Sequence, residues 1–166
     1  MREVTVAATQ MACSNETHKN VSNAEKLVRQ AASEGAQIIL IQELFESQYF
    51  CMDQKEELFE LSKPFEKHPT IKKFSELAKE LKVVLPVSFF EKANRAYYNS
   101  VAIVDADGSI LGNTESHTFL MDQATKKSFI LILETQVSKY GIQNMPRLGL
   151  VYVGSSGFQR PQGPWY

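Results

Sequence analysis

The chain carries four consecutive apolar residues at Ile38-Ile39-Leu40-Ile41, and this run ends abruptly at Gln42-Glu43. An unbroken apolar run of this length is typical of a strand buried on both faces, as parallel strands are between helix layers. The residues directly after such a strand lie at the edge of the sheet where open α/β folds place their sites. The segment therefore predicts a parallel α/β sheet and singles out Glu43 at its carboxyl edge.

The segments on either side alternate between strand and helix patterns. Apolar residues recur every three or four positions over 21–32 and 70–81, which places them on one face of a helix. Gly35 is expected to end the first helix, because glycine enters the left-handed cap without strain. This order predicts an α/β fold with helices packed on a mainly parallel sheet. Strands are expected at 4–9, 38–41, 83–90 and 101–104, a hairpin turn at 105–108, and a weaker helix signal lies at 56–61.

The composition fits one ordinary globular domain and disfavours several function classes. The 166 residues are 43% hydrophobic and carry a formal net charge of −1, so no basic field attracts nucleic acid or an anionic membrane. No run of about 18 apolar residues is present to span a bilayer, and the first residues lack a secretory pattern. We therefore expect a cytoplasmic protein that binds neither nucleic acid nor membrane.

The residues also give no sign of a metal site or a cofactor. Two cysteines are too few for a disulfide framework or a structural zinc site. His18, His68 and His117 form no ligand constellation, and no glycine loop is present to hold phosphate. Cys13 and Cys51 are best explained as small hydrophobic residues. Glu43 is the remaining candidate: partial burial would raise its pKa towards that of a general base, although a solvated loop carboxylate is an alternative.

The motifs around Glu43 resemble the nitrilase or carbon–nitrogen hydrolase superfamily, and more narrowly its branch of plant-type N-carbamoylputrescine amidases. The similarity runs nearly unbroken from Val4 to Gly112. It implies the N-terminal half of an α-β-β-α sandwich, a small-molecule substrate such as N-carbamoylputrescine, no cofactor, and a homo-oligomer for the intact family. The matching motifs are Gln42-Glu43-Leu44-Phe45-Glu46, Tyr49-Phe50-Cys51, His68-Pro69-Thr70-Ile71, Leu77-Ala78-Lys79-Glu80-Leu81, Pro86-Val87-Ser88-Phe89-Phe90-Glu91, Tyr98-Asn99-Ser100 and Asp105-Ala106-Asp107-Gly108.

The resemblance implies a Glu–Lys–Cys mechanism, in which Glu43 matches the catalytic general base. The family's lysine stabilises the charge on the attacked carbonyl oxygen, and its cysteine forms a covalent acyl-type intermediate that water cleaves. Both partners belong to segments that should follow Gly112, and neither segment is found there. Cys13 and Cys51 do not match the nucleophile's motif. The resemblance therefore implies a chain that retains only the glutamate and is inactive by itself.

Residues 113–166 differ in character from residues 1–112. The first stretch holds 13 Lys and Arg against 16 Asp and Glu, a net of −3, whereas the second holds 5 against 3, a net of +2. If the codons of the second stretch are read one frame apart, Asn113 through Gln123 can spell the family's lysine segment. In the same frame, Tyr152 through Trp165 can spell its cysteine segment. The codons of Met121, Met145 and Trp165 leave almost no freedom, and all three agree with the family pattern.

We therefore expect a truncated carbon–nitrogen hydrolase domain at 1–112 and an out-of-frame, irregular and partly disordered tail at 113–166. A divergent but genuine tail is the competing interpretation. For function, one alternative is a fragment of another carbamoyl or amide hydrolase, of the β-ureidopropionase or ω-amidase type. Another is a non-catalytic module that docks on intact subunits. A nucleotide-binding α/β module is a further option, but the sequence contains no phosphate-binding loop to support it.

Overall fold

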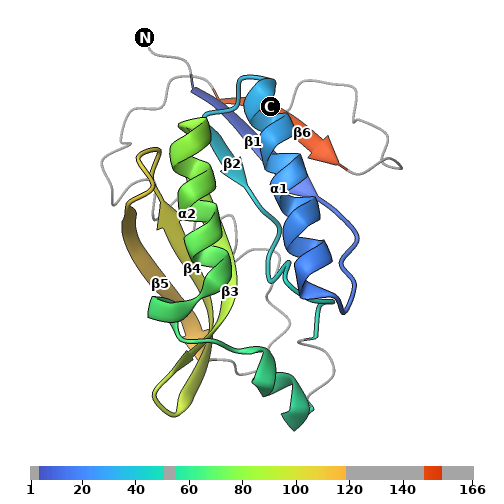
Figure 1. Ribbon diagram of the computed structural model, residues 1–166, viewed down its shortest axis with the longest axis vertical. Helices are drawn as coiled ribbons and strands as arrows, with labels where there is room; N and C mark the ends of the chain where they lie inside the picture. Colours follow the sequence, from blue (N-terminus) through green and yellow to red (C-terminus); the bar gives the residue numbers. More distant parts are fainter. Residues whose placement is uncertain (1–3, 51–54, 119–147, 155–166) are drawn as a thin grey trace.

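The computed structural model describes residues 4–50, 55–118 and 148–154, which form six strands and two α-helices (Figure 1). Two short 3-10 helices, η1 and η2, precede the second α-helix along the chain. The elements are β1 Val4–Gln10, α1 Thr17–Ser33, β2 Ile38–Leu40, η1 Glu56–Leu61, η2 Phe65–Lys67, α2 Pro69–Leu81, β3 Leu85–Ala93, β4 Ala96–Val104, β5 Ile110–Thr118 and β6 Leu148–Gly154.

The strands form two three-stranded sheets that meet between β2 and β3. In the first sheet, with the order β2-β1-β6, both pairs are parallel. In the second, with the order β3-β4-β5, both pairs are antiparallel. A single parallel bridge between Ile38 and Val84 joins the two sheets, and the Ile39 N–H donates to the Val84 carbonyl at 3.0 Å. The carboxyl ends of the parallel strands therefore share one edge, where the chain leaves β2 for Glu43.

Helices α1 and α2 lie side by side on the same side of the two sheets (Figure 1). Helix α1 contacts β1, β2 and β6 of the first sheet, and α2 contacts β3 and β4 of the second. Their apolar stripes and the sheet form the main core, in which Ala24, Val28 and Phe74 are fully buried. Two partly exposed ion pairs, Arg29–Glu80 and Lys73–Glu25, join the outer sides of the two helices. Ion pairs at the surface contribute little to stability.

The predicted α/β class is confirmed. The expectation of a mainly parallel sheet is wrong for β3-β4-β5, whose consecutive strands are joined by short turns and therefore pair antiparallel.

Several boundaries differ from the sequence expectations. Helix α1 begins at Thr17 rather than near Val21, and the 56–61 signal is a 3-10 helix. Strand β5 continues across Gly112 to Thr118, and β6 lies within the tail, so the described parts of 113–166 are regular strands. The rest of the tail, as well as Cys51, lies outside the described residues.

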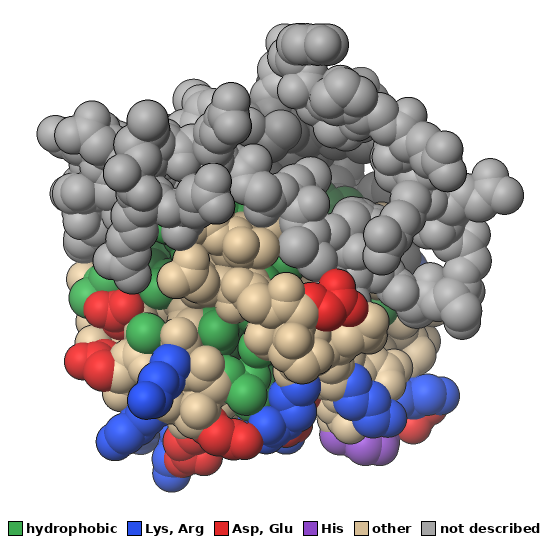
Figure 2. Space-filling model, turned by 90° about the horizontal axis from the view of Figure 1, so that it is seen from above, with side chains coloured by type: hydrophobic (Ala, Val, Ile, Leu, Met, Phe, Trp, Pro, Cys, Tyr) green, Lys and Arg blue, Asp and Glu red, His purple; other side chains and the backbone are tan. Residues whose placement is uncertain are grey.

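The described surface carries mixed charge. Seen from above, acidic and basic side chains alternate along the outer rim, and no patch of one sign is visible among the coloured residues (Figure 2). None of the helices in the described ranges is both long and apolar enough to cross a membrane.

Candidate functional site

Glu43 lies in the turn that follows β2, where the sequence placed it. The turn spans residues 43–46, and the Glu43 side chain is half-buried. The next residue, Leu44, is 3% exposed and has a φ of +48°, a left-handed conformation that costs a residue with a side chain about 1–2 kcal/mol. Such strain persists only where the surroundings hold it.

A neutral amide faces the Glu43 carboxylate. The Asn99 Nδ2 group, from β4, donates a hydrogen bond to Glu43 Oε1. Burial is the main effect on the carboxyl group and raises its pKa above the ordinary value, while the bond from Asn99 lowers it. A raised pKa is the direction that a general base working near neutral pH requires.

Cys13 lies beside this turn but lacks the setting of a nucleophile. Its sulfur accepts a hydrogen bond from Gln42 Nε2 at 3.1 Å and donates to the Phe45 carbonyl at 3.4 Å. Burial raises the pKa of the Cys13 thiol. Reactive cysteines show the opposite shift, since the thiolate is the nucleophile. The thiol therefore serves as a small packing and hydrogen-bonding group.

The register of the parallel strands places β6 next to the Glu43 edge. Tyr152 of β6 pairs with Ala8 of β1, and Ala8 pairs with Leu40 of β2. Adjacent strands lie about 4.8 Å apart, so the backbones at Tyr152 and Leu40 are separated by about 10 Å. Glu43 follows Leu40 by three residues. The end of β6 and the Glu43 turn are therefore neighbours at the same edge.

A second polar cluster, which the sequence analysis missed, surrounds His68. This residue is 2% exposed, its ring packs edge-on against Phe89 with the ring centroids 5.0 Å apart, and its Nε2 lies 3.4 Å from Glu46 Oε2. Thr70 Oγ1 donates to the other oxygen of Glu46. Burial lowers the pKa of His68, an effect that Glu46 opposes and Lys63 reinforces. The buried setting therefore disfavours the charged form of the His68 ring.

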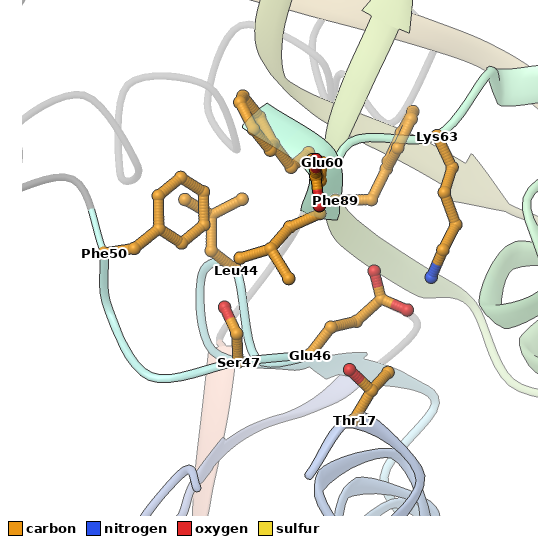
Figure 3. Close-up of a pocket in the computed structure, with 10 residues that line it drawn as sticks. Thr17, Leu44, Glu46, Ser47, Phe50, Glu60, Lys63 and Phe89 are labelled. Carbon is orange, nitrogen blue, oxygen red and sulfur yellow. The ribbon is translucent and has the colours of Figure 1, made fainter. Parts of the chain in front are cut away.

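Glu46 also lines a small pocket of about 110 Å³. Its carboxylate and the Lys63 ammonium group both point into the pocket, whose lining also includes Leu44, Phe50 and Phe89 (Figure 3). Leu44 belongs to the lining, whereas Glu43 does not. No group of three or more metal-ligating side chains is found in the described ranges, so neither cluster is a candidate metal centre.

Comparisons with known proteins assign this arrangement to a family. The carbon–nitrogen hydrolase family model matches residues 5–143, which extends beyond Gly112. The chain is 60% identical over 111 residues to an N-carbamoylputrescine amidase from Arabidopsis thaliana, and 41% identical over 112 residues to a citrullinase from Francisella tularensis. These alignments cover 67% and 68% of this chain but only 37% and 39% of those proteins.

A solved structure supports the same assignment. The carbon–nitrogen hydrolase from Helicobacter pylori superimposes with a TM-score of 0.63 at 30% identity, over 74% of this chain and 42% of that one. The yeast protein Nit3, at 21% identity and a TM-score of 0.54 over 63% of this chain and 40% of that one, shares the fold. Since the family match covers most of its length, this chain belongs to the carbon–nitrogen hydrolase family.

Proposed function

We propose that the chain derives from an N-carbamoylputrescine amidase, that Glu43 is the general base of that reaction, and that the chain as it stands does not perform it. The observation that carries the proposal is a half-buried carboxylate, with a raised pKa, at the carboxyl edge of a parallel sheet. With N-carbamoylputrescine as the substrate, the reaction releases putrescine, carbon dioxide and ammonia, a step of polyamine synthesis.

In this mechanism Glu43 takes the proton of a cysteine thiol, and the thiolate attacks the carbonyl carbon of the carbamoyl group. A lysine stabilises the negative charge that forms on the carbonyl oxygen. The C–N bond breaks as the protonated Glu43 returns its proton to the leaving nitrogen, and water then cleaves the resulting acyl-type intermediate and frees the thiol. The sequence has no cysteine after Cys51 and no lysine in the matching motif. A base without a thiol to deprotonate supplies no nucleophile.

The one-nucleotide shift of frame near Gly112 is inferred from the codons of the tail, and the register of β6 shows where the cysteine of the shifted frame would lie. In the shifted frame the cysteine arises across Tyr152 and Val153, and Tyr152 lies level with Leu40, about 10 Å away across two strand spacings. A cysteine at the end of this strand would therefore face the same edge as Glu43. The nucleotide sequence between the codons of Leu111 and Ser116, compared with transcripts, tests the shift directly.

Ammonia release from N-carbamoylputrescine tests the activity. We expect no release above background from the chain itself, and release from a version with the nucleotide restored. In the restored version, Glu43→Gln should lower the rate by at least about 100-fold, the usual contribution of a general base. The matched control is Glu34→Gln, an exposed carboxylate at the end of α1, which should not change the rate. Activity of the chain itself, or full activity of Glu43→Gln, would contradict the proposal.

The substrate is the finer part of the proposal. N-carbamoylputrescine follows from the name of the relatives that are 57–63% identical, and citrulline from the name of the relative at 41%. Rates of the restored version with N-carbamoylputrescine, citrulline and a simple ω-amide separate these candidates. We expect the highest kcat/KM for N-carbamoylputrescine, and a preference for either of the others would replace it.

A further inference from the structure

Strands β3 and β4 contact the Glu43 turn through two polar side chains, Ser88 and Asn99. Ser88 is 1% exposed, and its Oγ accepts a hydrogen bond from the Leu44 N–H at 3.1 Å. The same hydroxyl donates to Asn99 Oδ1 at 3.4 Å, and Asn99 Nδ2 donates to Glu43 Oε1. The bonds form a closed path from the backbone of Leu44 to the carboxylate of the preceding residue.

The direction of each bond in this path is fixed by elementary chemistry. An ionised carboxylate only accepts hydrogen bonds, so the amide nitrogen of Asn99 must face Glu43. The amide oxygen then faces Ser88, whose hydroxyl accepts the Leu44 N–H and donates its proton to this oxygen. The carboxylate therefore sets the orientation of Asn99, and the bond from Ser88 reinforces it.

The pairing of β4 with β5 is irregular at Asn99. The pairing of β4 with β5 shifts register between Tyr98 and Asn99, from Tyr98↔Thr118 to Asn99↔Ser116. Such bulges bend a strand and redirect a side chain, and they occur often beside active sites. The shift lies at the residue whose amide reaches Glu43.

We propose that Asn99 is a positioning residue, whose orientation Ser88 reinforces and which holds the Glu43 carboxylate at the sheet edge with a neutral donor. The proposal rests on the assignment of Glu43 as the base. A cationic partner would favour the ionised carboxylate so strongly that it would accept a proton poorly, whereas an amide fixes the geometry and preserves basicity. Asn99 acts on the reaction only through Glu43.

The test is the titration of Glu43 in the full chain, followed by NMR of ¹³C-labelled glutamate carboxyls and assigned with Glu43→Gln. Asn99→Leu removes the donor and should shift the Glu43 midpoint to higher pH, because burial then acts unopposed. Ser88→Ala, which keeps the amide but removes the bond that reinforces its orientation, should give a smaller shift in the same direction. Ser100→Ala is the matched control. Ser100 follows Asn99 in β4 and donates to a different buried carboxylate, that of Glu91, so its loss should leave the Glu43 midpoint unchanged.

Two outcomes overturn the proposal: a midpoint that Asn99→Leu does not move, or one that Ser100→Ala moves equally. If Asn99→Leu does not fold, Asn99→Gln and Ser88→Ala test the proposal instead. The Glu43 midpoint should stay near its normal pH in Asn99→Gln and should rise in Ser88→Ala. The assay separates this proposal from the proposed function. Full activity of Glu43→Gln in the frame-restored version would refute the proposed role of Glu43 as the base. A Glu43 midpoint that Asn99→Leu does not move would refute only the role of Asn99.

Discussion

Substitution of Asn20 by alanine should destabilise the protein by about 2–4 kcal/mol, because this residue joins α1 to the Glu43 turn. Asn20 is 1% exposed, and all of its side-chain hydrogen bonds are internal. Its Oδ1 accepts from the N–H and the hydroxyl of Ser14, at 2.9 and 3.2 Å. Its Nδ2 donates to the carbonyls of Ser14 and Glu46, at 2.6 and 3.0 Å.

The magnitude follows from these four bonds. Each contributes about 0.5–1.5 kcal/mol net, so together they contribute about 2–6 kcal/mol. Ser14 is only half-buried, and water can replace part of what its groups lose. The Glu46 carbonyl is less able to recover a partner, because the turn packs against α1. These corrections leave about 2–4 kcal/mol, a large fraction of the stability of a typical domain.

Urea unfolding followed by circular dichroism measures the effect. Asn23→Ala is the matched control, since it makes the same chemical change one turn along the same helix at a half-buried residue. It should change the free energy of unfolding by no more than about 0.5 kcal/mol. Equal stabilities of Asn20→Ala and Asn23→Ala would refute the view that Asn20 anchors the turn.

Three further predictions concern the backbone and the buried ionisable groups. Gly108→Ala should cost more stability than Gly35→Ala. Both positions have a positive φ, which costs a residue with a side chain about 1–2 kcal/mol. A Cβ at Gly108 would also lie 2.8 Å from the Ser75 carbonyl oxygen, whereas a Cβ at Gly35 meets nothing within 4 Å. Thermal melts compare the two, and equal losses would contradict the clash. Because the pKa of His68 is lowered in the fold, the unfolded chain binds the proton more readily, so stability should fall as pH drops below about 6.5, and less so in His68→Gln. Because the pKa of Glu43 is raised, its ionised form opposes folding, so Glu43→Gln should increase unfolding free energy at pH 7 and lose that advantage towards pH 4.

Helices and strands could be predicted where the spacing of apolar residues follows the buried face, and not where the buried side chains are polar. The stripe over 70–81 predicts α2 to within one residue, because its apolar positions face the core. The first turn of α1 was missed because it is polar: Asn20 is buried through hydrogen bonds rather than through apolar contact. The strand β5 extends past Gly112 by backbone pairing with β4, which no side-chain pattern in 113–118 indicates.

The candidate site likewise has a part that the sequence predicts and a part that it does not. Glu43 could be located because an apolar strand ends just before it, and a strand end is visible in one sequence. The contacts of Asn99 and Ser88 with this turn could not be predicted, since Asn99 lies 56 residues from Glu43 and Ser88 lies 44 residues from Leu44, and no periodicity links them. The burial of His68 depends on contacts with β3 that its polar neighbours in sequence conceal.

The energetic cost of the Glu43 turn is itself an argument about function. A turn selected only for stability would carry glycine at the left-handed position and a neutral side chain before it, whereas this chain has Leu44 and a half-buried carboxylate there. Side chains from α1, β3 and β4 all contribute hydrogen bonds that hold the turn. Strain and buried charge that are supported from several elements are expected where a position serves chemistry at the expense of stability. The cost therefore supports the proposed catalytic role of Glu43, independently of whether the partner residues are present in this chain.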